Sequence, residues 1–161
     1  MKVKLDEALF GDLILQANKS SRKRSHYILH KESTEPVQRF CIALKKGTYI
    51  RPQQHEKANK WELIVILKGT VGVVLFDSEG TIKEKVILNE SGSLKGIEIK
   101  AKSFHTLFPI TNEAIVLQVN EGPFVPTDEN EFASWAPKED DAKAIDYLNW
   151  LVKAKPGDKY S

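Results

Sequence analysis

Short apolar runs recur along most of the chain, and turn-forming residues separate them. Between about residues 25 and 120, runs such as VQRFCIAL, ELIVIL, TVGVVLF and AIVLQV are rich in β-branched and aromatic residues, which favour strands. The sequence DSEG at 77–80 indicates a hairpin turn, because Gly80 accepts a positive φ. At least seven short strands joined by close turns predict an all-β fold, an antiparallel sandwich or barrel.

One of these runs, ELIVIL at 62–67, is apolar on both faces of the strand that it predicts. A strand of this kind must be covered on both sides. We expect one face to point into the barrel and the other to meet a second sheet, a helix or a partner chain.

The two ends of the chain show helical spacing instead. Asp6 is a helix-capping residue, and Leu9, Leu13 and Ala17 follow it on one face of a short helix that ends near Asn18. The last segment, KEDDAKAIDYLNWLVK, predicts a C-terminal helix with acidic residues in its first turn. Its expected apolar face consists of Ala142, Ile145, Leu148 and Val152.

These patterns predict one domain in three parts. Residues 1–24 form an N-terminal helical arm, residues 25–126 the β-barrel, and residues 127–161 a loop and helix that pack on the barrel. A chain of 161 residues is long enough for one domain with a substantial core.

Composition narrows the range of partners. The net charge of +2 is too small to indicate nucleic acid or a membrane surface as a bulk partner. The single cysteine, Cys41, excludes an intramolecular disulfide and fits a reducing compartment. The N-terminal segment lacks the apolar core of a signal peptide, and no apolar run reaches the ~18 residues of a membrane helix. We expect a cytoplasmic protein.

Candidate chemistry gathers around the segment 48–69. Gln53 and His55 are two positions apart, so they share a face of an extended segment, and Glu62 opens the next predicted strand. His105 follows some forty residues later, at the start of another run. Imidazole and carboxylate groups are common ligands of transition metals, although this spacing alone also occurs by chance.

The spacing within this segment resembles the first cupin motif. Gly47 is followed by five residues, then by Gln53-x-His55, a gap, Glu62, six residues and Gly69. The cupin pattern has histidine where this chain has Gln53. The resemblance implies a cupin, jelly-roll antiparallel β-barrel.

The segment EIKAKSFHTLFP resembles the second cupin motif, with His105 at its histidine. Lys100 and Lys102 replace its usual proline and glycine, and Pro109 replaces its usual asparagine. More narrowly, the chain resembles WbuC-type cupin-fold metalloproteins, which occur with bacterial surface-polysaccharide genes. The matching segments are RKRS at 22–25, PVQR at 36–39, TYIRP at 48–52, KWEL at 60–63, EGPF at 121–124 and FASWAP at 132–137.

The resemblance implies a divalent transition metal, such as Fe, Mn, Ni, Zn or Cu, at Gln53, His55, Glu62 and His105. A glutamine oxygen is a weaker ligand than imidazole. The other three residues have the composition of a two-histidine, one-carboxylate site with open positions. In the alternative interpretation the metal site has decayed, and the barrel binds a ligand without metal.

Three further residues are candidates for substrate binding. Arg51 could pair with a carboxylate or phosphate, or form an ion pair at the rim. Tyr49 could offer its hydroxyl to a ligand, or serve only in packing. Gln118, on a late strand, faces the pocket if the strand register places it there.

Three functions are compatible with these residues, and whether the protein is an enzyme stays open. The first is a metal-dependent enzyme acting on a small polar molecule, such as a sugar or sugar-nucleotide derivative, in surface-polysaccharide biosynthesis. The second is a non-catalytic sugar-binding or regulatory module. The third is a metal-independent sugar-nucleotide epimerase or isomerase with His55 or His105 as its base. In each case we expect a small-molecule ligand in the barrel, and the resemblance implies a homodimer.

Overall fold

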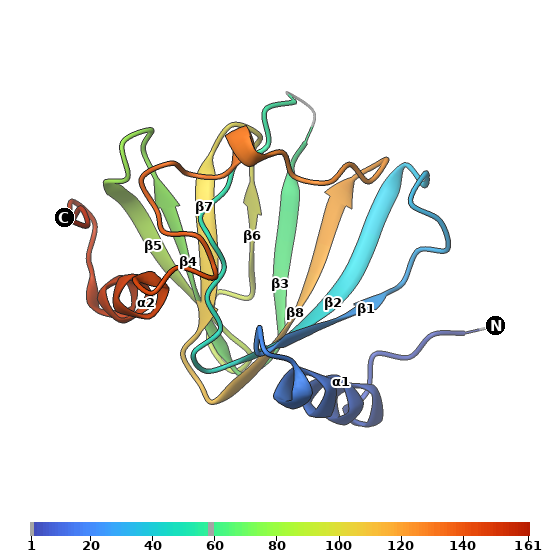
Figure 1. Cartoon of the computed structure of the whole chain (residues 1–161). Coiled ribbons are helices and arrows are strands. Elements are labelled where there is room, and N and C mark those ends of the chain that lie inside the picture. The colour runs from blue at the N-terminus through green and yellow to red at the C-terminus, as the bar shows by residue number, and fades with distance from the viewer. Residues whose placement is uncertain (1, 58–59) are drawn as a thin grey trace.

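Two antiparallel β-sheets form the body of the protein in a computed structural model that describes residues 2–57 and 60–161 (Figure 1). The larger sheet has the order β1 (Arg24–Ile28), β2 (Val37–Lys45), β8 (Glu113–Glu121), β3 (Glu62–Lys68) and β6 (Gly96–Ile99). The smaller sheet has the order β5 (Ile82–Asn89), β4 (Thr70–Phe76) and β7 (Phe104–Pro109). This arrangement confirms the predicted antiparallel jelly roll. Ala58 and Asn59, in the stretch EKANK, whose composition indicates a turn between two strands, lie outside the described residues.

The barrel interior is filled by alternate residues of these strands. On β3, Ile64 and Ile66 point inward, while Leu67 packs against the helix outside the sheet. The strand is therefore covered on both faces, as predicted from its sequence. The hairpin after β4 also follows the prediction, since Gly80 has φ +90°.

Helix α1 (Glu7–Lys19) covers the outer face of the larger sheet. The Asp6 side chain accepts a hydrogen bond from the Leu9 amide at 3.1 Å, which confirms the predicted cap. Buried residues of α1 meet the outward-facing Cys41 and Ala43 of β2. Cys41 is thus a packed core residue.

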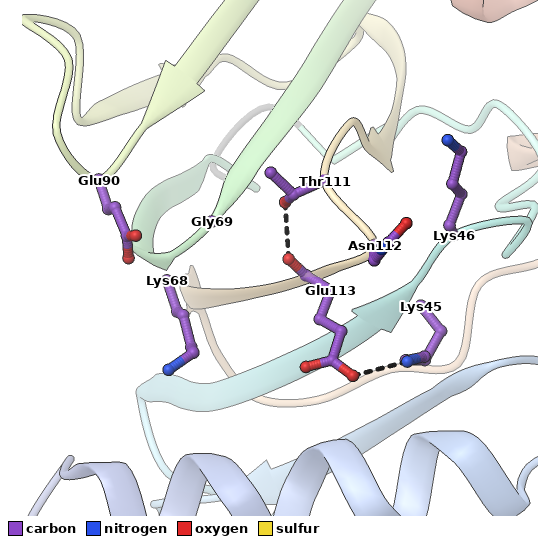
Figure 2. Close-up of a pocket in the computed structure, with 8 residues that line it drawn as sticks. All are labelled: Lys45, Lys46, Lys68, Gly69, Glu90, Thr111, Asn112 and Glu113. Atoms are coloured by element: carbon purple, nitrogen blue, oxygen red, sulfur yellow. Dashed lines mark hydrogen bonds and ion pairs between the residues drawn. The ribbon is translucent and has the colours of Figure 1, made fainter.

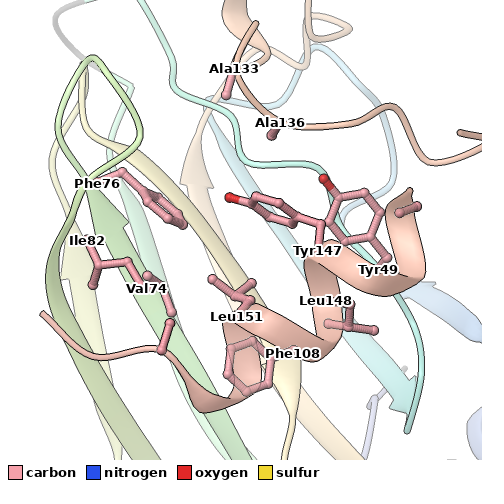
Figure 3. Close-up of a cluster of buried hydrophobic side chains, with 12 residues drawn as sticks. Tyr49, Val74, Phe76, Ile82, Phe108, Ala133, Ala136, Tyr147, Leu148 and Leu151 are labelled. Atoms are coloured by element: carbon pink, nitrogen blue, oxygen red, sulfur yellow. The ribbon is translucent and has the colours of Figure 1, made fainter. Parts of the chain in front are cut away.

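Helix α2 (Ala144–Lys153) packs on the outer face of the smaller sheet (Figure 3). The buried face of α2 includes Tyr147 and Leu151. The sequence had indicated a face with Ile145 and Val152, but these side chains are 52% and 47% exposed. Of the predicted face, Leu148 is buried as expected, but Ile145 and Val152 are not, because the bulky Tyr147 sets which side meets the sheet.

The segment between β8 and α2 crosses over the open ends of the strands (Figure 1). It contains the short helix η1 (Glu129–Glu131), and the Lys60 ammonium group donates to the carbonyls of Glu121 and Pro123 at its start. This segment closes one end of the barrel and forms part of the cavity wall. No helix in the described part of the chain is long and apolar enough to cross a membrane.

Candidate functional site

The barrel holds an interior cavity with two lobes, of about 200 and 360 Å³. The lobes share six lining residues, so they are parts of one space. The shared residues are Phe40, Gln53, Glu62, Gln118, Phe124 and Thr127. Amide, carboxylate and aromatic groups therefore meet between the two lobes.

Glu62 is the centre of this site. It opens β3 with its side chain turned inward, and the residue is only 3% exposed. Its Oε1 lies 2.8 Å from Nε2 of His55, and its Oε2 lies 2.8 Å from Nε2 of His105. The structure thus brings together three of the four predicted metal ligands around one carboxylate.

His105, on β7, is fixed by two acceptors. Its Nδ1 lies 2.9 Å from the Ser103 carbonyl oxygen, which can only accept, so this nitrogen carries a hydrogen. Its Nε2 faces the Glu62 carboxylate, so a proton or another cation must lie between these two atoms. Burial lowers the pKa of His105, but the charge of Glu62 and the hydrogen bonds to Glu62 and Ser103 outweigh it and raise the pKa.

The same contacts act on Glu62 in the opposite direction. Burial by itself raises the pKa of Glu62, but the charge of His105 and the hydrogen bonds from both histidines hold it well below its usual range. Glu62 is therefore a buried carboxylate and His105 its buried cationic partner.

His55 lies on the extended segment that precedes β3. Its other nitrogen, Nδ1, lies 3.9 Å from Oε1 of Glu131 in η1. The backbone of this segment is joined to β7, because Gln53 and His105 exchange both backbone hydrogen bonds, at 2.9 and 3.0 Å. Residues paired in this way have side chains on the same face, so the Gln53 side chain lies beside that of His105.

Gln118 on β8 lines both lobes and is 8% exposed. It pairs with Phe40 of β2 and Ile64 of β3. The inward orientation that the sequence left open is therefore settled, while the binding of a substrate by this residue stays a prediction.

Tyr49 does not face the cavity. Its ring packs against Tyr147 of α2, and its hydroxyl donates to the Pro137 carbonyl at 2.8 Å (Figure 3). The structure contradicts the expected ligand contact, because this hydroxyl is bound inside the core cluster beneath α2. Burial also raises the pKa of Tyr49.

Arg51 is likewise turned away from the site. Its Nε and Nη2 donate to the Ala133 carbonyl at 3.2 and 2.9 Å, and its Nη1 pairs with Glu129 at 2.9 Å. The guanidinium also lies over the Phe132 ring, 5.3 Å from the centroid. The expectation of a substrate-orienting arginine was wrong, because Arg51 anchors the segment that closes the barrel; the rim ion pair was the correct alternative.

Asn120, two residues after Gln118 on β8, belongs to the site but was not predicted. Its Nδ2 donates to Oε1 of Glu62 at 3.4 Å, and the two residues are cross-strand partners. The signal was present in the sequence, since residues two apart on a strand share a face. The pairing of β8 with β3 was the missing information.

Within residues 2–57 and 60–161, no group of three or more His, Cys, Asp or Glu side chains is arranged as a metal site. Each histidine Nε2 lies 2.8 Å from a carboxylate oxygen of Glu62. To bind a metal ion, Nε2 of each histidine would have to give up its hydrogen bond to Glu62.

A second, larger hollow of about 570 Å³ lies at the surface, away from this site (Figure 2). Two of its lysines form ion pairs: Lys45 with Glu113 at 2.6 Å, and Lys68 with Glu7 of α1 at 2.6 Å. We assign this hollow no chemistry.

Comparison with known proteins places the chain in a family. Residues 5–88, about half of the chain, match the model of a domain of unknown function, DUF6016. The chain belongs to this family. No curated protein matches it.

Several solved structures are similar to this DUF6016 protein. KdgF from Halomonas sp. has 18% sequence identity and a TM-score of 0.50, over 64% of this chain and 81% of that one. A structure of the DMSP lyases RdDddP and RnDddQII has 14% identity and a TM-score of 0.50, over 66% and 51%. An RmlC-like cupin family protein with a double-stranded β-helix fold, from Methanocaldococcus jannaschii, has 17% identity and a TM-score of 0.46, over 60% and 80%. The chain has the cupin fold, as its motifs predicted.

Proposed function

We propose that this protein is a metal-dependent cupin enzyme that acts on a small polar molecule, with a divalent transition metal held by His55, Glu62 and His105. One observation carries the proposal: His55 and His105, from two separate segments, both contact the buried carboxylate of Glu62 between the two lobes of a cavity.

The donor set fits a metal ion. The Ser103 carbonyl holds the hydrogen of His105 on Nδ1, which leaves Nε2 as the nitrogen that can bind a metal. Two imidazole nitrogens and a carboxylate suit Fe, Mn, Ni, Zn or Cu, and leave positions for water or substrate. Gln53, beside His105, is the candidate for a weaker, neutral ligand.

A bound metal ion would supply Lewis-acid chemistry, or a site for oxygen, within the cavity. The chain's own groups would do the rest. Without a metal, a proton lies between Glu62 and His105, and a bound metal ion would take its place. Glu62 and the two histidines would therefore set the net charge of the site. Gln118 offers its amide to a polar ligand, and Phe40 and Phe124 provide apolar surface against which a ring can pack.

The finer assignment rests on sequence resemblance. The WbuC-like segments favour a sugar or sugar-nucleotide derivative in surface-polysaccharide biosynthesis as the substrate, and a homodimer as the assembly. The mixture of amide and aromatic groups in the cavity supports a hydroxyl-rich ligand. Size-exclusion chromatography with light scattering would test the homodimer.

A second candidate is a metal-independent acid–base enzyme, such as an epimerase or isomerase. It is favoured by the hydrogen bonds of both histidines to Glu62, since a carboxylate-bound imidazolium can donate a proton to a substrate. A non-catalytic sugar-binding or regulatory module would need neither a metal nor this proton.

Elemental analysis of the purified protein tests the main proposal. We expect about one metal ion per chain in the native protein, and loss of this metal in His55→Ala. Gln53→His, which adds an imidazole beside His105, is the gain-of-ligand control. Metal in Gln53→His but none in the native chain would mean that the site has decayed, and would contradict the proposal.

A further inference from the structure

Gln38, Asn120 and Glu62 form a row across three neighbouring strands. Asn120 of β8 pairs directly with Gln38 of β2 on one side and with Glu62 of β3 on the other. All three residues line the smaller lobe of the cavity. Directly opposed residues of antiparallel strands have Cβ atoms about 5 Å apart, so the three side chains are within reach of one another.

Two oxygen atoms in this row lack partners. Nε2 of Gln38 donates to the carbonyls of Ser33 and Glu35, at 3.2 and 2.8 Å, so the orientation of this amide is fixed and its Oε1 faces the other way. Nδ2 of Asn120 donates to Glu62, which turns Oδ1 away from the carboxylate. Both oxygens are buried, and neither has a hydrogen-bond partner among the residues that the structure describes.

An unpaired buried acceptor is costly, and a half-turn of the Asn120 amide would trade its hydrogen bond to Glu62 for a donor near the Gln38 oxygen. If the Asn120 amide turned by half a revolution, its Nδ2 would face the strand of Gln38, whose Oε1 needs a donor. Its Oδ1 would then face the Glu62 carboxylate. Two oxygens in that position repel each other unless a cation lies between them.

The distances at Glu62 suit such a cation. Neighbouring ligands of a metal with bonds of about 2.1 Å are themselves about 3 Å apart. Oε1 of Glu62 lies 2.8 Å from Nε2 of His55 and 3.4 Å from the terminal atom of the Asn120 amide. The end of the Asn120 side chain is therefore close to the place that a further ligand would take.

We propose that Asn120 is a metal ligand through Oδ1, and that Gln38 is its positioning residue, accepting a hydrogen bond from the rotated Nδ2. The inference rests on the proposed metal site, to which it adds a neutral oxygen from β8. This oxygen is a neutral ligand, a role for which Gln53 is the other candidate.

Calorimetric titration of the metal-free protein with Zn²⁺ separates this role from a merely structural one. Asn120→Leu should weaken Zn²⁺ binding by about tenfold, since it removes the oxygen. Asn120→Asp should strengthen binding, because a carboxylate is a better ligand than an amide. If Asn120 served only to donate to Glu62, Asn120→Leu would leave the Zn²⁺ affinity close to that of the native protein, while the added charge of Asn120→Asp would still raise it.

Gln38→Met should weaken Zn²⁺ binding by a smaller factor, because the rotated amide loses its acceptor. Asn112→Asp is the matched control, since it makes the same change at the surface hollow and should leave the affinity unchanged. Circular dichroism melting of each variant checks that it folds. In the native protein, Zn²⁺ should shift the side-chain amide signals of Asn120 and Gln38 in nitrogen-15 spectra and leave that of Asn112 in place.

The outcomes distinguish the two proposals. Equal Zn²⁺ affinity in the native protein and Asn120→Leu, with unshifted amide signals, would overturn the role of Asn120 and leave the three-residue site standing. Weaker Zn²⁺ binding in Gln53→Ala but not in Asn120→Leu would show that Gln53, and not Asn120, supplies the neutral oxygen ligand. No Zn²⁺ binding by the native protein would overturn both.

Discussion

The interior cavity and the surface hollow of Figure 2 are both lined by carboxylates and cations, but the two regions treat these charges differently. In the hollow, Lys45 and Glu113 meet at the rim, where each side chain keeps part of its exposure, 24% and 36%. In the cavity, Glu62 and His105 meet with only 4% of each side chain exposed.

This difference in burial decides what each region can do. An exposed ion pair is screened by water and contributes little. A buried carboxylate stays ionised only when nearby groups stabilise its charge, as two imidazoles do here. The space between the carboxylate and these imidazoles therefore favours a cation, either a proton or a metal ion.

The largest expected effect comes from removing the buried carboxylate. Glu62→Ala should lower the free energy of unfolding by about 3 kcal/mol, because it leaves His105 buried without its counter-ion. Glu113→Ala, the matched change in the hollow, should cost less than about 1 kcal/mol. Urea unfolding of both variants measures the difference. Equal losses would remove the distinction between the two regions.

Arg51 provides a second comparison, between anchoring and ligand binding. Arg51→Met removes two donors from the Ala133 carbonyl, which keeps only the Ala136 N–H at 3.3 Å, and should lower the free energy of unfolding by about 2 kcal/mol. The metal content should stay the same. An unchanged stability together with lost metal or ligand binding would restore the interpretation of Arg51 as a site residue.

A smaller effect is expected at Glu139, which joins the segment before α2 to Arg22 and Arg24. Burial by itself raises the pKa of Glu139. The hydrogen bonds and charges of the two arginines lower this pKa by more, so the net shift is downward. Its contribution is present above the ordinary glutamate pKa of about 4.3 and is lost as the pH falls through the folded-state value.

The stability difference between the native protein and Glu139→Gln should therefore be about 1 kcal/mol near pH 6 and should shrink below about pH 4. Urea unfolding at a series of pH values gives this difference directly. A difference that stayed constant down to about pH 3 would show that the carboxylate charge contributes nothing.

The sequence predicted the elements of the barrel and the position of α1, because strand alternation and a helix cap are local signals. It also brought His55, Glu62 and His105 into one proposed site through motif spacing, and the structure confirms that they meet. The face of α2 was predicted in part, since only the contact of Tyr147 with the sheet decides which side is buried.

The segment at 49–55 shows why the site was only partly predictable. Simple alternation places Tyr49, Arg51, Gln53 and His55 on one face, but the structure turns the first two toward α2 and the closing segment. Pro52 interrupts the regular pattern between them. Asn120 was missed for the opposite reason, since its importance depends on the pairing of β8 with β3, which is not a local property of the sequence.

Anomalous diffraction from a crystal grown with Zn²⁺ locates the metal itself. The proposed site predicts one strong peak within about 2.3 Å of Nε2 of His55, Nε2 of His105 and a carboxylate oxygen of Glu62. A cavity without a peak, in crystals that bind Zn²⁺ only at the surface, would contradict the metal site and leave the hydrogen-bonded His–Glu–His group as the functional centre.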